Sequence, residues 1–342
     1  MAKRSYSKKG RKIEPAVYTM AFGLPSGAAT STIDLSQCAS LMNRRFYRQG
    51  INWVVTGFKV ISAGGAVGSL SIAQLPNTWV MSNAWEKGFR AWQRMNREAL
   101  SETESARPKF LDFKIYADDV HHASTRTDGG VVVNGFDANL LPISFAGNTP
   151  TRGEWVASKV VQPKTDGTDD VQEREIIAVG ANYPGTAPTG HNAVSLIEGY
   201  AASRGLPDVL DPNVPGDAAS ANDNIPANWL ASMFNEGTDQ TEAVLEDMIT
   251  ENNIAPYPFE NDGVHTDTMY PGGANQLVGL QYHDSAIISS ITVGGITHMK
   301  GGNFPCGLIR ISSNVDTAGT IIQVNLSPGD HRGYLCEPMT EM

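Results

Sequence analysis

The chain has 342 residues, of which 26 are Lys or Arg and 36 are Asp or Glu, so its formal charge is −10. With 41% hydrophobic and 18% charged residues, the composition is that of a globular protein and excludes a chain that is disordered throughout. Six basic side chains and no acidic one fall within the first twelve residues: Lys3, Arg4, Lys8, Lys9, Arg11 and Lys12. The remaining residues hold 20 basic and 36 acidic side chains, a formal charge of −16. This division predicts an acidic body with a basic N-terminal arm.

Signals for a membrane or an oxidising compartment are not found. The apolar runs are shorter than the roughly 18 to 20 residues that a membrane-spanning helix needs, so we expect no membrane insertion. The basic start is followed by Ile-Glu-Pro at 13–15 and not by the apolar stretch of a secretory leader. Three widely spaced cysteines, Cys38, Cys306 and Cys336, fit neither a disulfide framework nor a zinc site. We therefore expect a reducing compartment.

Short segments with alternating, β-branched or aromatic side chains recur along the whole chain and predict about ten strands. We place them at 16–22, 53–61, 67–75, 110–116, 130–133, 154–161, 175–179, 277–282, 286–293, 308–312 and 320–326. They do not alternate regularly with helices, which favours an all-β fold of antiparallel sheets, a sandwich or a barrel. Gly294-Gly295 and Gly301-Gly302-Asn303 are expected to form hairpin turns.

Four segments have the spacing of helices. In the segment 84–100, apolar residues share one face, while Lys87, Arg90, Arg94 and Arg97 lie within an arc of about 80° on the opposite face. The other three are expected over 34–43, 193–203 and 242–252. A stretch rich in Pro and Asp at 205–226 predicts a long loop. We expect a flexible arm at 1–14 and a single domain at 15–342, with an irregular or helical insertion around 185–275.

Motifs of enzymes and cofactor sites are not evident. The segment Ala63–Gly68 lacks the first glycine of a dinucleotide-binding loop and is followed by a predicted strand, where such a loop requires a helix. Asp118, Asp119, His121 and His122 form the densest group of potential metal ligands, but a solvated loop edge is the simpler interpretation. We therefore expect no catalysis, no metal and no cofactor.

Two basic features remain. Arg44, Arg45 and Arg48 flank Phe46 and Tyr47, and such a mixture of guanidinium groups and aromatic rings is typical of grooves that bind single-stranded nucleic acid. An ordinary amphipathic stretch whose arginines pair with acidic residues explains the pattern equally well. The arm of residues 1–12 cannot bury a core, so we expect it to stay flexible and to bind phosphate groups with release of counterions. A solubilising tail or a nuclear-import signal is the alternative for the arm.

Three segments resemble capsid proteins of environmental circular, Rep-encoding single-stranded DNA viruses. They are residues 34–53, with Asn43-Arg44-Arg45-Phe46-Tyr47-Arg48-Gln49-Gly50; Leu75-Pro76-Asn77-Thr78-Trp79 with the following helix at 85–100; and Ser327-Pro328-Gly329-Asp330-His331-Arg332-Gly333-Tyr334. The similarity covers most of residues 16–342. It implies a jelly roll of eight strands in two four-stranded sheets, which assembles into a closed icosahedral shell of about sixty or more copies with the arm directed inwards.

The resemblance therefore implies a structural protein that packages single-stranded DNA through its basic arm. Because the arm is shorter than is common in such viruses, Arg44, Arg45, Arg48 and the basic face of the helix at 84–100 are further candidates for DNA contacts. We expect the protein in the virion and, during assembly, in the host nucleus or cytoplasm, with a host import receptor as an additional partner of the arm. The main alternative is a cellular β-sandwich that binds a carbohydrate or another ligand through exposed Trp and Tyr, and an enzyme of unfamiliar class comes third.

Overall fold

The computed structural model describes residues 15–101, 103, 105, 111–128, 130–143, 151–163, 171–182, 193–204, 279–291 and 293–342. The predicted arm at 1–14, the predicted helix at 242–252 and most of the predicted insertion lie outside the described residues. By its internal contacts the chain divides into one unit of residues 1–195 and 279–342 and a second of residues 196–278. The described part of the second unit is the helix α4 (Leu196–Arg204), and the other described elements belong to the first unit.

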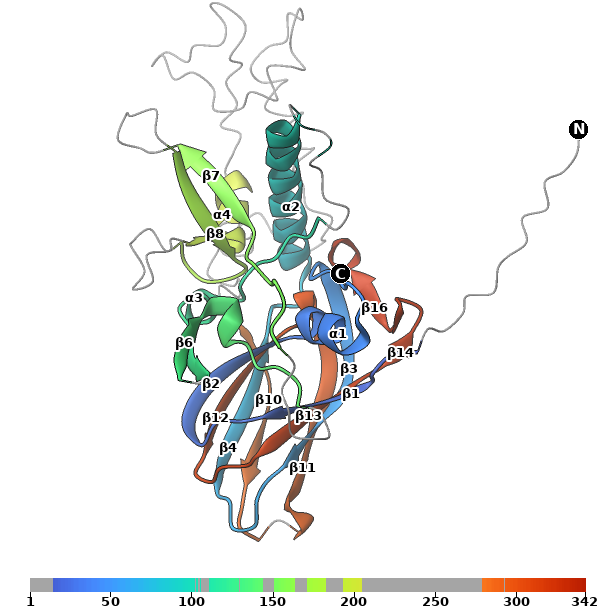
Figure 1. Cartoon of the computed structure of the whole chain (residues 1–342), viewed down its shortest axis with the longest axis vertical. Helices are drawn as coiled ribbons and strands as arrows, with labels where there is room; N and C mark the ends of the chain where they lie inside the picture. Colours follow the sequence, from blue (N-terminus) through green and yellow to red (C-terminus); the bar gives the residue numbers. More distant parts are fainter. Residues whose placement is uncertain are drawn as a thin grey trace, which may run out of the picture. The chain divides into compact units, whose positions relative to one another are not determined.

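Two antiparallel sheets form most of the first unit (Figure 1). The first has the strand order β1 (Thr19–Gly23), β13 (Ile321–Leu326), β3 (Ile51–Ile61) and β11 (Ile296–Phe304), with the short β16 (Cys336–Pro338) also paired to β3. The second has the order β10 (Gln281–Ile288), β4 (Gly68–Gln74), β12 (Leu308–Val315) and β2 (Gly27–Asp34). The prediction of an all-β protein with antiparallel sheets and few helices is therefore confirmed.

The two sheets share one hydrophobic core. Alternate residues of their strands are buried, and side chains from both sheets belong to the same cluster, among them Phe22, Phe58, Ile72 and Ile311. Alternation places every second side chain of a strand on one face, so these strands bury one face and leave the other open. Each fully buried side chain of this size contributes about 1.5 to 3 kcal/mol to stability relative to its exposed state.

Most other elements lie in the chain between β4 and β10. They are α2 (Trp79–Leu100), α3 (Asp119–His122), β5 (Thr125–Asp128), β6 (Val131–Asn134), β7 (Lys159–Pro163), β8 (Val171–Ile177), β9 (Ala193–Ser195) and α4. The strands β5 and β6 pair with each other, and β8 pairs antiparallel with β7 and parallel with β9. A short helix, α1 (Leu35–Asn43), connects β2 to β3. Both α1 and α3 lie at the same end of the two sheets (Figure 1).

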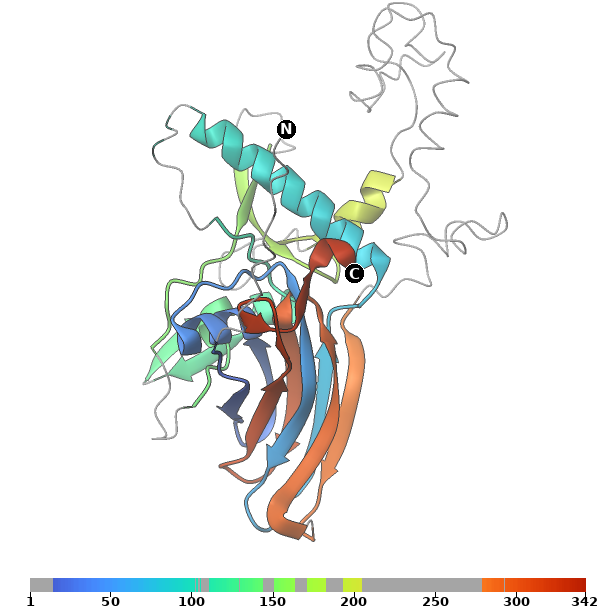
Figure 2. The same cartoon turned by 90° about the vertical axis from the view of Figure 1, so that its right-hand side faces the viewer.

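Capping side chains mark where the two predicted helices of the first unit begin. Helix α1 starts after Asp34, whose carboxylate accepts hydrogen bonds from the backbone N–H groups of Ser36 and Gln37. Helix α2, which Figure 2 shows as the longest helix, starts after Thr78, whose hydroxyl accepts a hydrogen bond from the Met81 N–H. It therefore begins five residues before the predicted start.

No helix among the described residues is long and apolar enough to cross a membrane.

The predicted strands at 16–22, 53–61, 67–75, 130–133, 308–312 and 320–326 are confirmed by β1, β3, β4, β6, β12 and β13. The predicted strands at 154–161 and 175–179 overlap β7 and β8 at one end only, and 277–282 and 286–293 contribute to one strand, β10. Residues 111–115 are not a strand, and Tyr116 makes a single bridge to Ile177. In the two main sheets, the strands β2 and β11 and the short β16 were not predicted.

The two predicted glycine turns are wrong as hairpins. Gly294 and Gly295, with φ of 72° and 63°, do form a tight turn, but it joins β10 and β11, which belong to different sheets. Gly301 and Gly302 lie inside β11, where the backbone of β3 comes very close: a Cβ on Gly301 would lie 2.2 Å from the carbonyl oxygen of Val55. Glycine here permits close approach and does not mark a turn.

Candidate nucleic-acid interface

The loop that carries the predicted arginines follows α1 and is anchored by Tyr47. The Tyr47 side chain is fully buried, its hydroxyl donates to the carbonyl oxygen of Arg332 at 2.9 Å, and its ring centroid lies 5.9 Å from that of Trp53 and 5.5 Å from that of Tyr334. A buried ring cannot stack on a nucleic-acid base. The expectation that Tyr47 offers stacking surface is therefore wrong, and Tyr47 holds the loop on the core.

Phe46 faces the other side of the loop. It is half-buried and packs against a second hydrophobic cluster that includes Tyr116, Phe136 and Trp155. Its carbonyl oxygen accepts a hydrogen bond from the guanidinium group of Arg332. Phe46 thus links the loop to the chain between β4 and β10 and to the C-terminal segment.

A buried polar network lies beneath the loop. The Gln49 side chain donates to Asp34 Oδ2 at 3.0 Å and accepts from the Ile115 N–H at 2.7 Å, while Trp155 Nε1 donates to the same Asp34 oxygen at 2.9 Å. Burial raises the pKa of Asp34 to about 6, although its four hydrogen bonds oppose this rise. One carboxylate therefore ties together α1, the end of the arginine loop and the segment that carries Trp155.

A second buried carboxylate, Asp112, lies beside the same loop. Burial raises its pKa, and the positive charges of Lys114 and Arg48 act in the opposite direction. Lys114 Nζ lies 3.6 Å from Asp112 Oδ2 and 4.6 Å from the ring centroid of Trp155, and Lys114 is itself largely buried. Lys114 therefore neutralises Asp112 inside the protein.

The predicted arginines gather at the point where the described chain begins. Arg44 and Arg48 are exposed, and Arg45 is half-buried and donates through Nη1 to the carbonyl oxygen of Pro15 at 3.2 Å. Pro15 directly follows the predicted arm. The body thus presents basic side chains beside the residue to which the arm is attached.

Arg332 is a further basic residue at this place, and sequence reasoning did not select it. It is exposed and lies in the turn between β14 (Pro328–Gly329) and β15 (Gly333–Tyr334). No local sequence signal places it beside Phe46, because 286 residues separate the two. Its only sequence signal was its position in a segment that resembles viral capsid proteins.

The basic face of α2 is present as predicted but is partly neutralised by the helix itself. Lys87, Arg90, Arg94 and Arg97 are all exposed. Arg90 forms an ion pair with Glu86, and Arg94 forms one with Glu98, each one helical turn away. Such pairs on a solvent-exposed helix surface stabilise the helix by a few tenths of a kcal/mol each and reduce the positive potential of the face. The face is therefore a weaker candidate for DNA contacts than the arginine loop.

The group of potential metal ligands at 118–122 is not a solvated loop edge, and that interpretation is wrong. Residues 119–122 form α3, and both of its histidines are buried. His121 Nδ1 accepts from the Ala117 N–H at 3.0 Å, and its Nε2 lies 2.8 Å from Asn139 Oδ1. Burial lowers the pKa of His121 to about 3. His121 is therefore a neutral structural residue at physiological pH.

The neighbours of His121 also bind separate partners. His122 Nε2 lies 2.8 Å from Glu175 Oε2, and Asp118 pairs with the buried guanidinium group of Arg310. Across the described residues, no group of three or more His, Cys, Asp or Glu side chains could hold a metal ion. Asp118, His121 and His122 are adjacent in sequence, but each binds a different partner within the protein.

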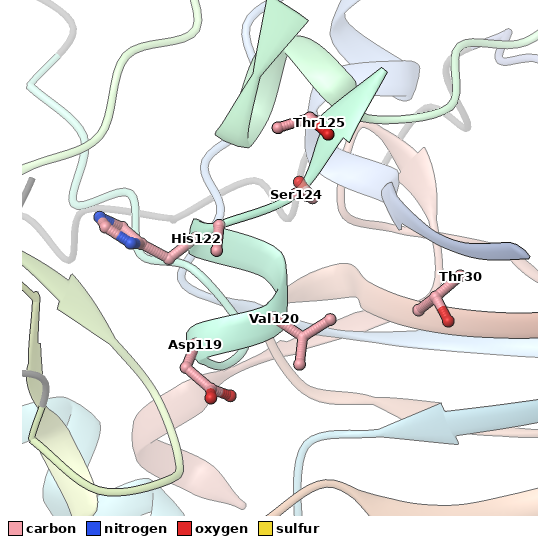
Figure 3. Close-up of a pocket in the computed structure, with 7 residues that line it drawn as sticks. Thr30, Asp119, Val120, His122, Ser124 and Thr125 are labelled. Carbon is pink, nitrogen blue, oxygen red and sulfur yellow. The ribbon is translucent and has the colours of Figure 1, made fainter. Parts of the chain in front are cut away.

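A hollow of about 330 Å³ lies beside α3 (Figure 3). Its lining consists of Thr30, Asp119, Val120, His122, Ala123, Ser124 and Thr125. The His122 ring points away from Ser124 and Thr125 (Figure 3). Ser124 Oγ donates to the carbonyl oxygen of His121 at 2.7 Å. A hydroxyl nucleophile needs a base within hydrogen-bond reach. The side chains drawn here do not form such a pair.

The six basic residues of the predicted arm, Lys3 to Lys12, lie outside the described residues. Comparison of the chain with protein-family models, with curated proteins and with solved structures finds no match.

Proposed function

We propose that the chain is the coat subunit of a small icosahedral single-stranded DNA virus and that its two main sheets form a jelly-roll sandwich. The order of the strands supports this most directly. Numbered along the chain from one to eight, β1, β2, β3, β4, β10, β11, β12 and β13 lie in the orders 1-8-3-6 and 5-4-7-2. Every connection except the fourth-to-fifth passes from one sheet to the other, as in the winding of two Greek keys that defines a jelly roll.

Charge separation supports a coat protein among the proteins that use this fold. The chain joins an arm with six cations to a body with a formal charge of −16. In a closed shell of about sixty subunits, the arms would supply on the order of 360 positive charges to the packaged DNA. Pro15, the residue that follows the predicted arm in the sequence, accepts a hydrogen bond from Arg45, so at least one arginine of the body lies beside the point where the arm is attached.

The alternative of a carbohydrate-binding module depends on exposed Trp and Tyr side chains, and Tyr282 on β10 is 63% exposed. Of the five tryptophans that the structure describes, Trp53, Trp85, Trp92 and Trp155 are buried and Trp79 is half-buried. An aromatic platform for sugars needs an open ring face, so these tryptophans give that alternative no support. Jelly rolls also occur in lectins and cupins, which makes assembly the property that separates the two functions.

Expression of the full chain on its own tests the proposal. We expect closed particles of uniform diameter in negative-stain electron microscopy, and co-purified nucleic acid that nuclease treatment of the intact particles does not remove. A strictly monomeric protein in light scattering at physiological salt would contradict the coat function. A glycan-array signal from such a monomer would support the alternative.

A further inference from the structure

Two of the exposed arginines have an unusual backbone conformation. Arg44, at the C-terminal cap of α1, has φ of 54° and ψ of 35°, and Arg332 has φ of 50°. Among the described residues other than glycine, only Cys306 also has a positive φ. This left-handed conformation favours glycine and, after it, asparagine, and helices often end with glycine in it. Arginine therefore occupies two positions where a smaller residue suits the backbone better.

The folding role of these positions belongs to the main chain and not to the arginine side chains. The Arg332 carbonyl oxygen accepts from the Tyr47 hydroxyl at 2.9 Å, and its N–H donates to the Asp330 carbonyl oxygen at 3.1 Å. Glycine or asparagine would keep both bonds. The Arg332 guanidinium group donates to the Phe46 carbonyl oxygen, which engages part of a group with five N–H donors. Arg44 is exposed at the end of its helix.

The two arginines belong to segments that are held together. Asn43, the residue before Arg44, donates to the Tyr334 hydroxyl at 2.8 Å, and Tyr334 is two residues after Arg332. Asn43 also accepts from the Val17 N–H at 3.0 Å, which brings the first residues after the arm to the same place. The helix end, the β14–β15 turn and the start of the described chain thus meet.

We propose that Arg44 and Arg332, together with Arg48, bind phosphate groups of a single-stranded DNA backbone at the point where the arm joins the body. This inference rests on the proposed function and adds a fixed site to the flexible arm. The planar guanidinium fork matches two oxygens of a phosphate, and strained backbone conformations persist mainly at functional sites. Asp330 is an exposed acid in the same turn and weakens the site's positive potential.

The test compares the full chain with its double variant Arg44→Gly/Arg332→Gly in binding a fluorescein-labelled oligo-dT over a series of salt concentrations. For single-stranded DNA, each lost phosphate contact reduces the slope of log K against log salt by about 0.7, so the double variant should lose about 1.4. If both affinities converge at 1 M salt, the variant binds about 25-fold more weakly at 0.1 M. Its thermal midpoint should stay equal or rise by about 2 to 4 °C, because glycine relieves the strain.

Two controls separate charge from structure. Arg44→Lys/Arg332→Lys keeps both charges and should retain most of the slope. Lys300→Gln removes an exposed cation from β11, outside the proposed site, and should change neither slope nor midpoint. If the glycine variant does not fold, Arg44→Asn/Arg332→Asn is measured in its place. Unchanged slope and affinity in a folded glycine or asparagine variant, or a loss of folding in both, would overturn the inference.

The same experiments distinguish failure of the site from failure of the coat function. Particles whose DNA content and affinity are unaffected by the double variant would leave the coat function standing and remove the site. If the protein never assembles but the double variant binds DNA more weakly than the natural protein, the phosphate site would stand and the coat function would be removed.

Discussion

The buried carboxylate of Asp34 joins helix α1 to the end of the arginine loop. It caps α1 through two backbone N–H groups and accepts from both Gln49 and Trp155 while fully buried. Burial penalises its charged form, and for that reason its pKa is about 6. His121 has the opposite shift, to about 3, because burial penalises its protonated form. The two residues therefore give stability an opposite dependence on pH.

Replacing Asp34 by asparagine should expose this opposition. Folded Asp34 binds a proton more tightly than the unfolded chain does, so its contribution to stability is complete below pH 4 and is lost as the pH rises through 6, by about 3 kcal/mol at most. The His121 contribution is present above pH 6.5 and is lost as the pH falls towards 3. In Asp34→Asn the Asp34 contribution is gone and the His121 contribution remains. The free energy of unfolding should therefore rise more steeply between pH 4 and 6.5 than in the natural protein.

Urea unfolding at several pH values from 4 to 7 measures this difference. The control variant Asp137→Asn makes the same chemical change at an exposed aspartate and should leave the dependence of the unfolding free energy on pH unchanged. The absolute stability of Asp34→Asn is also expected to fall, because an amide nitrogen cannot accept the bonds of Gln49 and Trp155. Parallel pH curves for the natural protein and Asp34→Asn would contradict the assignment.

Distance along the chain explains which residues of the site the sequence could predict. Arg44, Arg45 and Arg48 are recognisable as a local cluster, and the basic face of α2 follows from helical spacing. Contacts that join distant segments have no such signal: Arg332 reaches Phe46 across 286 residues, and Gln49 reaches Ile115 across 66. The burial of Tyr47 could not be predicted for the same reason, since the rings that cover it come from β3 and β15.

At the scale of elements, the side chains of β10 cover the free edge of β11. Among the strands that the structure describes, β11 pairs with β3 on one side and ends its sheet on the other. On that outer side the Lys300 N–H donates to Asp284 Oδ2 at 2.8 Å, and His283 Nε2 lies 3.0 Å from the Lys300 carbonyl oxygen. The unpaired backbone groups of an edge strand can pair with a strand of another chain. Here the side chains of Asp284 and His283 bind the N–H and the carbonyl oxygen of Lys300.

Gly302 lies at the same contact between β10 and β11, and it shows why this part of β11 was predicted to be a turn. The His283 ring lies over Gly302, where a Cβ would come within 2.6 Å of His283 Cε1, and it also contacts Phe304, with ring centroids 5.0 Å apart. Glycines that serve close packing break the β-branched pattern by which strands are recognised. The strand β2, which was also not predicted, has the sequence GAATSTID, and its small residues give little alternation between apolar and polar side chains.

The double variant His283→Ala/Asp284→Ala should uncover this edge. We expect a loss of about 1 to 3 kcal/mol of stability for two hydrogen bonds and, more specifically, faster formation of cross-β aggregates, followed by thioflavin T fluorescence at 37 °C. Ser285→Ala changes the next residue of β10, which bonds to Tyr282 and not to β11, and should behave as the natural protein does. Equal aggregation rates in the two variants would show that the edge is protected in another way.

At the scale of the whole molecule, the sequence could predict strands but not their neighbours. The alternation that identified β1 and β13 is local, whereas their pairing joins Thr19 to Asn325. Likewise, β4 and β10 are neighbours although the helices α2, α3 and α4 lie between them in sequence. Strand order, which carries the proposed jelly roll, is therefore information that composition and periodicity do not contain.

The division of charge between arm and body leads to the last prediction. Deleting residues 2–12 removes six cations and no acid. A stretch so rich in charge cannot bury a core, so we expect the body to fold and the shell to assemble. Binding of single-stranded DNA should lose about 4 from the slope of log K against log salt, and purified particles should show a lower ratio of absorbance at 260 nm to that at 280 nm. A variant of unchanged length, with Gln at all six positions, separates charge from length and should match the deletion. Unchanged nucleic-acid content in both would transfer DNA binding to the body, where Arg44, Arg48 and Arg332 then have to account for all of it.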